Sequence, residues 1–156
     1  IRQNDGKGGV RGYDGGKKIK GRKRHLVVDT EGLLLKAFVS EAQCADGTVG
    51  VWLLPGLRRR FPRLSKLWAD GTYRGLFVDQ AAALNIDVEI TTRLSDRPGF
   101  QVIPRRWVSE RTFAWLGHYR RLSKDYEYWV YTSDAMIYAV MVHLMVRRLA
   151  RLQATE

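Results

Sequence analysis

Two apolar runs on either side of a short polar turn constrain the fold of this chain most strongly. Residues 25–40 read HLVVDTEGLLLKAFVS, and the Thr30-Glu31-Gly32 turn between the runs predicts a β-hairpin. Further strands are predicted at 63–70 and 86–93, and helices at 46–61 (interrupted at Pro55-Gly56), 73–84, 105–122 and 133–152. Because strands and helices alternate along 156 residues, the sequence predicts one mixed α/β domain.

The charge of the chain restricts its partners. A net charge of +11 and a pI of about 10.2 predict a polyanionic partner, nucleic acid first and an anionic membrane surface second. The apolar run 135–146 contains His143 and is shorter than the roughly 20 residues that span a bilayer, so it predicts a buried helix with His143 in the core. Cys44 is the only cysteine, which excludes an internal disulfide and fits a reducing cytoplasm.

The N-terminal segment is predicted to be a flexible arm. Six glycines lie among residues 1–16 and a basic run occupies 17–24, so the arm covers residues 1–22 and the folded domain 23–156. Cations of this region are candidates for DNA phosphate contacts, although a targeting signal or a solubilising arm would carry the same charge. These candidates are Lys18, Lys20, Arg22, Lys23 and Arg24.

The predicted helix 105–122 contains one acid, Glu110, among arginines and aromatic residues. At 100° per residue, Arg106 and Arg121 fall on the side of Glu110, where they favour an anion. The alternative is an Arg106–Glu110 pair on a surface helix, which is worth only a few tenths of a kcal/mol and needs no function. The opposite side forms an apolar stripe of Val108, Thr112, Trp115, Tyr119 and Leu122.

Asp70 is the second candidate acid. It ends a predicted strand and is followed by Gly71, at the edge of the sheet where α/β proteins place their sites. An Asp-Gly pair is also a common turn former, so the position alone leaves both readings open. If Asp70 and Glu110 lie together beside basic residues, their carboxylates suit Mg²⁺, which prefers carboxylate and phosphate oxygens.

The segments WADGTY (68–73) and RRWVSERTFAWLGHYRRLSKDYE (105–127) resemble the DDE transposases of bacterial insertion sequences. The likeness extends to GYDGGKKIKGRKRHLVVDTEGLLL (12–35) and SDAMIYAVMVHLMVRRLA (133–150). The resemblance implies an RNase H-like mixed sheet flanked by helices, as in retroviral integrases. It also implies Mg²⁺- or Mn²⁺-dependent cleavage of DNA followed by attack of a DNA 3′-hydroxyl on target DNA. The implied partners are the terminal repeats of the element and the target DNA, in the cytoplasm at the nucleoid, with no membrane.

Site residues follow from the resemblance position by position. Asp70 matches the second catalytic acid of the family, within Asp-Gly-x-Tyr, and Glu110 matches the third, within Glu-Arg-x-Phe-Ala-Trp-Leu. Arg106 matches the arginine of the tyrosine-arginine-glutamate-lysine signature of the broader group. The tyrosine and lysine positions of that signature are Ile103 and Gly117 here, so Arg120 and Arg121 are implied as replacement phosphate contacts.

The first catalytic acid of the family has no clear counterpart in the sequence. Asp5 and Asp14 lie in glycine-rich sequence, and Asp29 in the hairpin is expected to be structural. We therefore expect a C-terminal portion that lacks the first strand, as a frameshift product, a truncation or a decayed gene copy, and that is inactive without an upstream segment. The sequence also leaves open whether the chain forms a homo-oligomer. Two other functions remain: a non-enzymatic basic nucleic-acid-binding module, and an RNase H-like nuclease that only hydrolyses.

Overall fold

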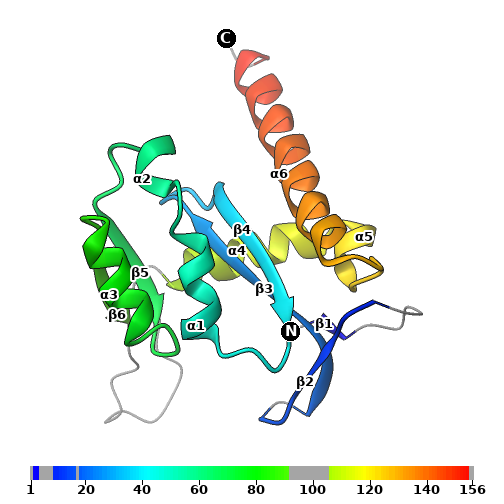
Figure 1. Cartoon of the computed structure of the whole chain (residues 1–156). Coiled ribbons are helices and arrows are strands. Elements are labelled where there is room, and N and C mark those ends of the chain that lie inside the picture. The colour runs from blue at the N-terminus through cyan, green and yellow to red at the C-terminus, as the bar shows by residue number, and fades with distance from the viewer. Residues whose placement is uncertain (1, 4–8, 17, 92–105, 155–156) are drawn as a thin grey trace, which may run out of the picture.

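The computed structural model describes residues 2–3, 9–16, 18–91 and 106–154 (Figure 1). Its strands are β1 (Arg2–Gln3), β2 (Gly12–Asp14), β3 (Ile19–Val28), β4 (Leu34–Glu41), β5 (Lys66–Asp70) and β6 (Asp87–Thr91). Its helices are α1 (Asp46–Gly50), the single 3-10 turn η1 (Val51–Leu53), α2 (Leu57–Arg60), α3 (Leu76–Ala83), α4 (Arg106–Gly117), α5 (Arg120–Ser123) and α6 (Val130–Gln153).

The strands form two sheets. In the first, β3 and β4 are the predicted antiparallel hairpin, with a register that runs from Arg22 opposite Glu41 to Val28 opposite Leu34. Strands β1 and β2 pair antiparallel with the first residues of β3. In the second sheet, β5 and β6 are parallel and α3 connects them. This mixed α/β arrangement confirms the predicted fold class and is compatible with an RNase H-like fold.

Side chains of the hairpin turn explain why the chain reverses there. Asp29 Oδ1 accepts hydrogen bonds from the backbone N–H groups of Glu31 (2.9 Å) and Leu33 (2.8 Å). Gly32 adopts a φ of +79°, a conformation that costs other residues energy. The carboxylate of Asp29 therefore stabilises the turn, in agreement with the structural role predicted for it.

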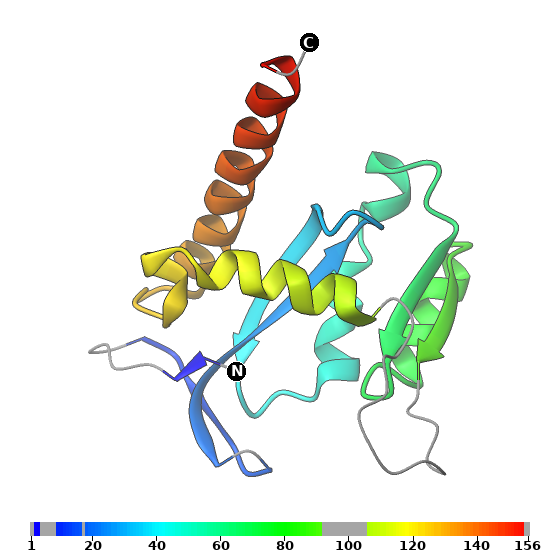
Figure 2. The same cartoon turned by 180° about the vertical axis from the view of Figure 1, so that it is seen from behind.

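Helices cover both faces of the hairpin, with α1 on one face and α4 on the other (Figures 1 and 2). Neighbouring residues of β3 point to opposite faces, so Val27 belongs to one core cluster and Leu26 packs against the other. The first cluster joins η1, α2, β5 and α3 through Leu53, Leu54, Leu57, Leu67, Phe77, Ala81 and Ile86. The second joins β4, α4, α5 and α6 through Ala37, Val39, Leu116, Leu122, Ile137, Val140 and Met141.

Two predicted helices are interrupted. The segment predicted at 46–61 is split into α1, η1 and α2, because Gly56 takes a left-handed φ of +79°. The segment predicted at 105–122 ends at Gly117, and Arg120 begins the separate helix α5. Glycine at the end of a helix favours such a break.

The first 22 residues also differ from the prediction. The described part of this segment is not a free arm, because β1 and β2 pair with β3, which itself begins at Ile19. Gly12 is buried, and an ideal Cβ there would lie only 1.2 Å from the Gln43 side chain. Gly12 thus allows close packing of the segment against Gln43.

No helix among the described residues is long and apolar enough to cross a membrane. His143, predicted in the core, is exposed, and its Nδ1 lies 2.9 Å from the Tyr119 hydroxyl.

Candidate active site

Asp70 is the last residue of β5 and is half-buried. Its Oδ1 accepts hydrogen bonds from the backbone N–H of Thr72 (2.9 Å) and from the Thr72 hydroxyl. The carbonyl of Asp70 accepts a hydrogen bond from the N–H of Tyr73 (3.1 Å). One carboxylate oxygen therefore holds the turn after the strand, and Oδ2 is the oxygen that can be offered to a ligand.

The turn after Asp70 rests on the first residues of α1. An ideal Cβ at Gly47 would lie 2.9 Å from the carbonyl oxygen of Thr72, so only glycine allows this approach without a shift. The Arg74 side chain lies beside Gly71: an ideal Cβ built on Gly71 would be 3.6 Å from Arg74 Nη2. Asp70 thus has a guanidinium group close to its strand end.

Three polar side chains, of which His25 and Ser40 are buried, are linked by hydrogen bonds to this turn. The Tyr73 hydroxyl is 2.8 Å from His25 Nδ1, and His25 Nε2 is 2.9 Å from Ser40 Oγ. Burial lowers the pKa of His25 to about 4, so the ring is neutral at pH 7. Burial, followed by the nearby carboxylates of Asp46 and Asp70, raises the pKa of Tyr73, so its hydroxyl stays protonated. The site is therefore supported by neutral groups.

Glu110 lies on α4 and is exposed. The opposite side of α4 is docked on the hairpin, because Thr112 Oγ1 donates to the carbonyl of Gly32 (2.7 Å) and Arg111 Nη2 donates to the carbonyl of Glu31 (2.9 Å). Of the predicted stripe, Val108, Thr112 and Leu122 are buried, whereas Trp115 and Tyr119 are half-buried. The helix therefore presents Glu110 away from the core, as its periodicity predicts.

The two elements that carry the acids are neighbours in space. Helix α4 contacts β5, and both views show the N-terminal end of α4 beside that strand (Figures 1 and 2). Asp70 ends the strand and Glu110 lies in the first half of the helix. Segments that are far apart in the sequence are thus neighbours in the fold, and each of them carries one of the two candidate acids.

The basic run 17–24 is divided by the alternation of β3. Lys18 and Lys20 are exposed. Lys23 Nζ donates to the carbonyl of Cys44 (2.8 Å) and forms an ion pair with Asp46 (2.9 Å). Arg24 Nη1 donates to the carbonyl of Leu122 (2.8 Å). Lys23 and Arg24 therefore make contacts that stabilise the fold. Lys18 and Lys20 are the exposed cations of the run.

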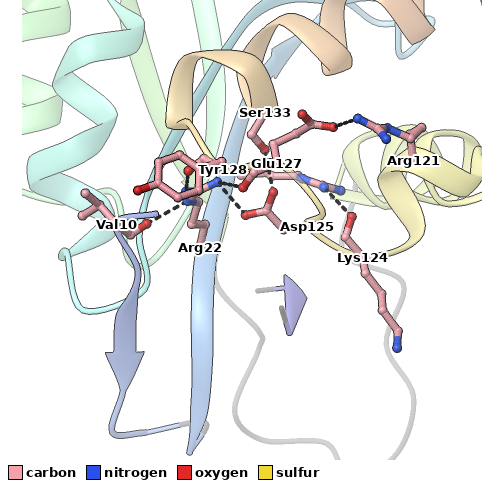
Figure 3. Close-up of polar contacts among 9 residues, drawn as sticks. Val10, Arg22, Arg121, Lys124, Asp125, Glu127, Tyr128 and Ser133 are labelled. Carbon is pink, nitrogen blue, oxygen red and sulfur yellow. Dashed lines mark hydrogen bonds and ion pairs between the residues drawn. The ribbon is translucent and has the colours of Figure 1, made fainter. Parts of the chain in front are cut away.

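Arg22 is buried, with an exposed fraction of 1%, which argues against the predicted phosphate contact. Figure 3 shows its guanidinium between residue 10 and the segment that joins α5 to α6. It donates to the carbonyls of Val10 (2.9 Å), Glu127 (2.9 Å) and Tyr128 (2.6 Å) and pairs with Asp125 (3.1 Å). Because these partners occupy its guanidinium inside the protein, Arg22 is a structural anchor.

Arg120 and Arg121 belong to the separate helix α5, so the helical periodicity that predicts Arg121 beside Glu110 does not continue to them. Arg121 pairs with Glu127, and its side chain is 61% exposed. Arg120 is exposed on α5. Asp5, Ile103 and the side chain of Arg106 lie outside the described residues, so the structure does not place them.

Metal ligands are limited in the described part of the chain. Within it, no three His, Cys, Asp or Glu side chains are grouped as a metal site would need. Asp14 lies 3.7 Å from Lys23, and Asp29 stabilises the hairpin turn. Asp14 and Asp29 thus have structural contacts, and Asp70 and Glu110 stay the ligands that the sequence predicts.

Several residues of this region were not identified from the sequence. The position of Arg74 is visible in the sequence, since this cation follows the Asp70-Gly71 turn by only a few residues. Tyr73 is the tyrosine of the Asp-Gly-x-Tyr motif, but its contact with His25 carries no signal, because it joins distant segments. Asp125 lies within the motif 105–127, but only the structure shows that it is the buried partner of Arg22.

Comparison with known proteins gives the family. A family profile described as "Transposase DDE domain" matches residues 2–145, which is most of the chain. No match is found among curated proteins or among solved structures. The matched range includes the hairpin, Asp70 at the end of β5 and Glu110 on α4. The chain therefore belongs to the DDE-domain transposases.

Proposed function

We propose that this chain contributes Asp70 and Glu110 to a metal-dependent site that cleaves the ends of an insertion sequence and joins them to target DNA. The family supplies the transposase function and a DNA substrate. The observation that supports the site most is the contact of α4 with β5, which brings the two acid-bearing segments together. Neither acid is needed for a buried core contact, since Glu110 is exposed and Asp70 half-buried.

The donor set suits Mg²⁺ or Mn²⁺. Both are hard cations that take carboxylate oxygens, water and phosphate oxygens. When bound, such ions activate an attacking hydroxyl and stabilise the leaving oxygen of a phosphodiester. Asp70 Oδ2 and the Glu110 carboxylate hold the cation in this proposal, while Asp70 Oδ1 keeps the strand end in place through Thr72.

Cations around the site then bind the phosphate backbone. Arg74 lies over the turn next to Asp70, and Arg106 precedes Glu110 by one helical turn. Further DNA contacts in this proposal come from the exposed residues Lys18, Lys20 and Arg120 and from the largely exposed Arg121. Such contacts position DNA without reading its sequence.

A third carboxylate completes the proposed site. Two divalent ions held close together repel each other, so a bridging acid is needed to offset the repulsion. Within the described ranges, residues 23–28 of β3 pair only with β4, and β5 pairs only with β6. A strand that carries an aspartate would fit between β3 and β5, in the same polypeptide or from a separate one. We therefore expect residues 1–156 to be inactive alone.

The test is a cleavage and joining assay on DNA with the terminal repeats of the element that encodes this chain. The protein is supplied with a preceding segment that bears an acidic strand, and reactions contain Mg²⁺ or EDTA. We expect Mg²⁺-dependent nicks and joined products from the extended protein. The substitutions Asp70→Asn and Glu110→Gln should each abolish both products, because each removes a charged oxygen ligand.

The matched control is Asp79→Asn, which removes a carboxylate from an exposed position of α3. It should leave the products unchanged. DNA binding without any products would favour the non-enzymatic module, and nicks without joining would favour a nuclease. Full activity of residues 1–156 alone would contradict the need for a third acid.

A further inference from the structure

Helix α6 carries an apolar surface that the fold does not cover. Val142, Leu149 and Leu152 are 53%, 61% and 67% exposed. The other side of the helix is buried, with Ile137 and Met141 in the second core cluster. In both views the C-terminal half of α6 projects past the sheet and the other helices (Figures 1 and 2). The exposed side chains are therefore not needed to pack the domain.

The spacing of these residues follows the heptad pattern of a helix that packs against another helix. Apolar residues separated alternately by three and four positions form the seam of a coiled coil. On α6 this series is Ala135, Tyr138, Val142, Met145, Leu149 and Leu152. Five of these six are exposed by more than a third, and Met145 is half-buried against the second core cluster. The Tyr138 hydroxyl accepts a hydrogen bond from the Ala37 N–H (2.9 Å), which leaves part of its ring on the surface. The pattern spans most of the helix.

We propose that α6 pairs in antiparallel orientation with α6 of a second copy of this chain. The series is complementary to itself in that orientation. Val142 then faces Met145 of the second copy, Tyr138 faces Leu149, and Ala135 faces Leu152, each contact occurring twice by symmetry. Every seam residue thus meets an apolar partner in one register.

Charge favours this orientation over the parallel one. Arg147, Arg148 and Arg151 lie in the last turns of α6, and Asp134, near its start, is the only acid in the helix. Parallel helices would bring the arginines of both copies together, which is unfavourable. Antiparallel helices separate them.

The start of the helix also suits an arginine-rich partner segment. Trp129 and Tyr131 are 55% and 69% exposed, and their rings are stacked with centroids 6.1 Å apart. In the antiparallel pair the last turns of the second copy lie near these rings, where guanidinium groups are attracted to aromatic faces. An apolar stripe with aromatic rings at one end and arginines at the other fits a second copy better than it fits DNA phosphates.

The first experiment measures the mass of the full chain in solution by sedimentation equilibrium over a range of concentrations. We expect a dimer for the unchanged chain and at least a tenfold weaker dimer, about 1.4 kcal/mol, for Leu149→Glu. The matched control is Ala150→Glu, which adds the same charge at the exposed neighbouring position outside the seam. It should remain dimeric. Because both positions are exposed, circular dichroism should show unchanged helix content for both variants.

A second experiment fixes the orientation. Cys44, the only native cysteine, is replaced by serine, and single cysteines are placed by Ala135→Cys or Leu152→Cys in separate chains. These positions are about 25 Å apart on one helix. Antiparallel pairing predicts a disulfide between the two different variants in a mixture and none within either variant alone.

Four results would overturn the proposal. Disulfides within each variant alone would show parallel helices. A monomer at all concentrations would exclude pairing, and a monomer that binds anionic vesicles through the same stripe would assign the surface to a membrane. Equal dimerisation of Leu149→Glu and Ala150→Glu would place the interface elsewhere.

Discussion

Arg22 Nη1 lies 3.1 Å from Asp125 Oδ2, although 103 positions separate the two residues. Both side chains are 1% exposed. Asp125 Oδ1 also accepts a hydrogen bond from Ser133 Oγ at 3.1 Å, which links the pair to α6. The first sheet is thereby joined to the segment between α5 and α6 at the far end of α4.

Loss of this ion pair should destabilise the fold. We expect Arg22→Met to lower the free energy of unfolding by about 3–5 kcal/mol, because Asp125 is left as a buried charge without its partner. The double variant Arg22→Met/Asp125→Leu should lose less than the sum of the single variants. Urea unfolding measures these values. The control Arg120→Met, at an exposed position, should change stability by less than about 0.5 kcal/mol; an equal loss would contradict the anchor role of Arg22.

Two glycines with the same backbone angle allow a second prediction. Gly32 and Gly56 both have φ of +79°, but an ideal Cβ at Gly32 would lie 2.8 Å from Thr112 Oγ1. At Gly56 the same position has open space around it among the described residues. Gly56→Ala should cost about 1–2 kcal/mol from the backbone alone. Gly32→Ala should cost roughly 1–3 kcal/mol more, because it also disturbs the contact of α4 with the hairpin. Equal losses on thermal or urea unfolding would show that this contact contributes little.

Stability should depend on pH through His25. Burial lowers its pKa from 6.5 to about 4, so the unfolded chain takes up the proton first as pH falls. The contribution is fully present above pH 6.5 and decreases by roughly 3 kcal/mol as the pH approaches 4. Burial raises the pKa of Asp134 to about 6, which acts in the opposite direction.

The His25 contribution is therefore read from the difference between the unchanged chain and His25→Gln. Urea midpoints of the two proteins, measured from pH 7.5 to 4.5, should converge as the pH falls. A constant difference over this range would mean that His25 does not titrate as its burial indicates.

Surface cations should dominate DNA binding. Lys20 is exposed, whereas Lys23, three positions later in β3, forms an ion pair with Asp46 of α1. Lys20→Gln should weaken binding to all sequences and reduce the slope of log K against log salt by about 0.9. Lys23→Gln should lower stability and change the slope less. Fluorescence anisotropy at several salt concentrations measures both; an unchanged slope for Lys20→Gln would remove it from the interface.

The sequence predicts those parts of the fold that depend on residues close together in the chain. The hairpin at 25–40 follows from two apolar runs and a turn that Asp29 and Gly32 stabilise. The apolar side of α4 follows from helical periodicity, which Val108 and Thr112 confirm by their burial. These features depend on residues within a few positions of one another, so they are visible before the chain is folded.

Tertiary contacts were not predictable in the same way. The sequence predicts an arm over residues 1–22, but β3 begins at Ile19, and Arg22 pairs with an acid in a distant segment. The helix from 105 was extended too far, although Gly117 signals its end. The positions of Asp70 and Glu110 on neighbouring elements followed from the family resemblance, because no local pattern links β5 to α4.

The central claim is that Asp70 and Glu110 hold the same divalent cation. A double-variant cycle on Mn²⁺ affinity, measured by calorimetry with the full chain, tests it most directly. If both carboxylates bind one ion, Asp70→Asn and Glu110→Gln should each weaken binding at least about tenfold, and the double variant should be little worse than either one. Additive losses would show two independent weak sites, and unchanged affinity in the single variants would contradict the assignment of these residues as metal ligands.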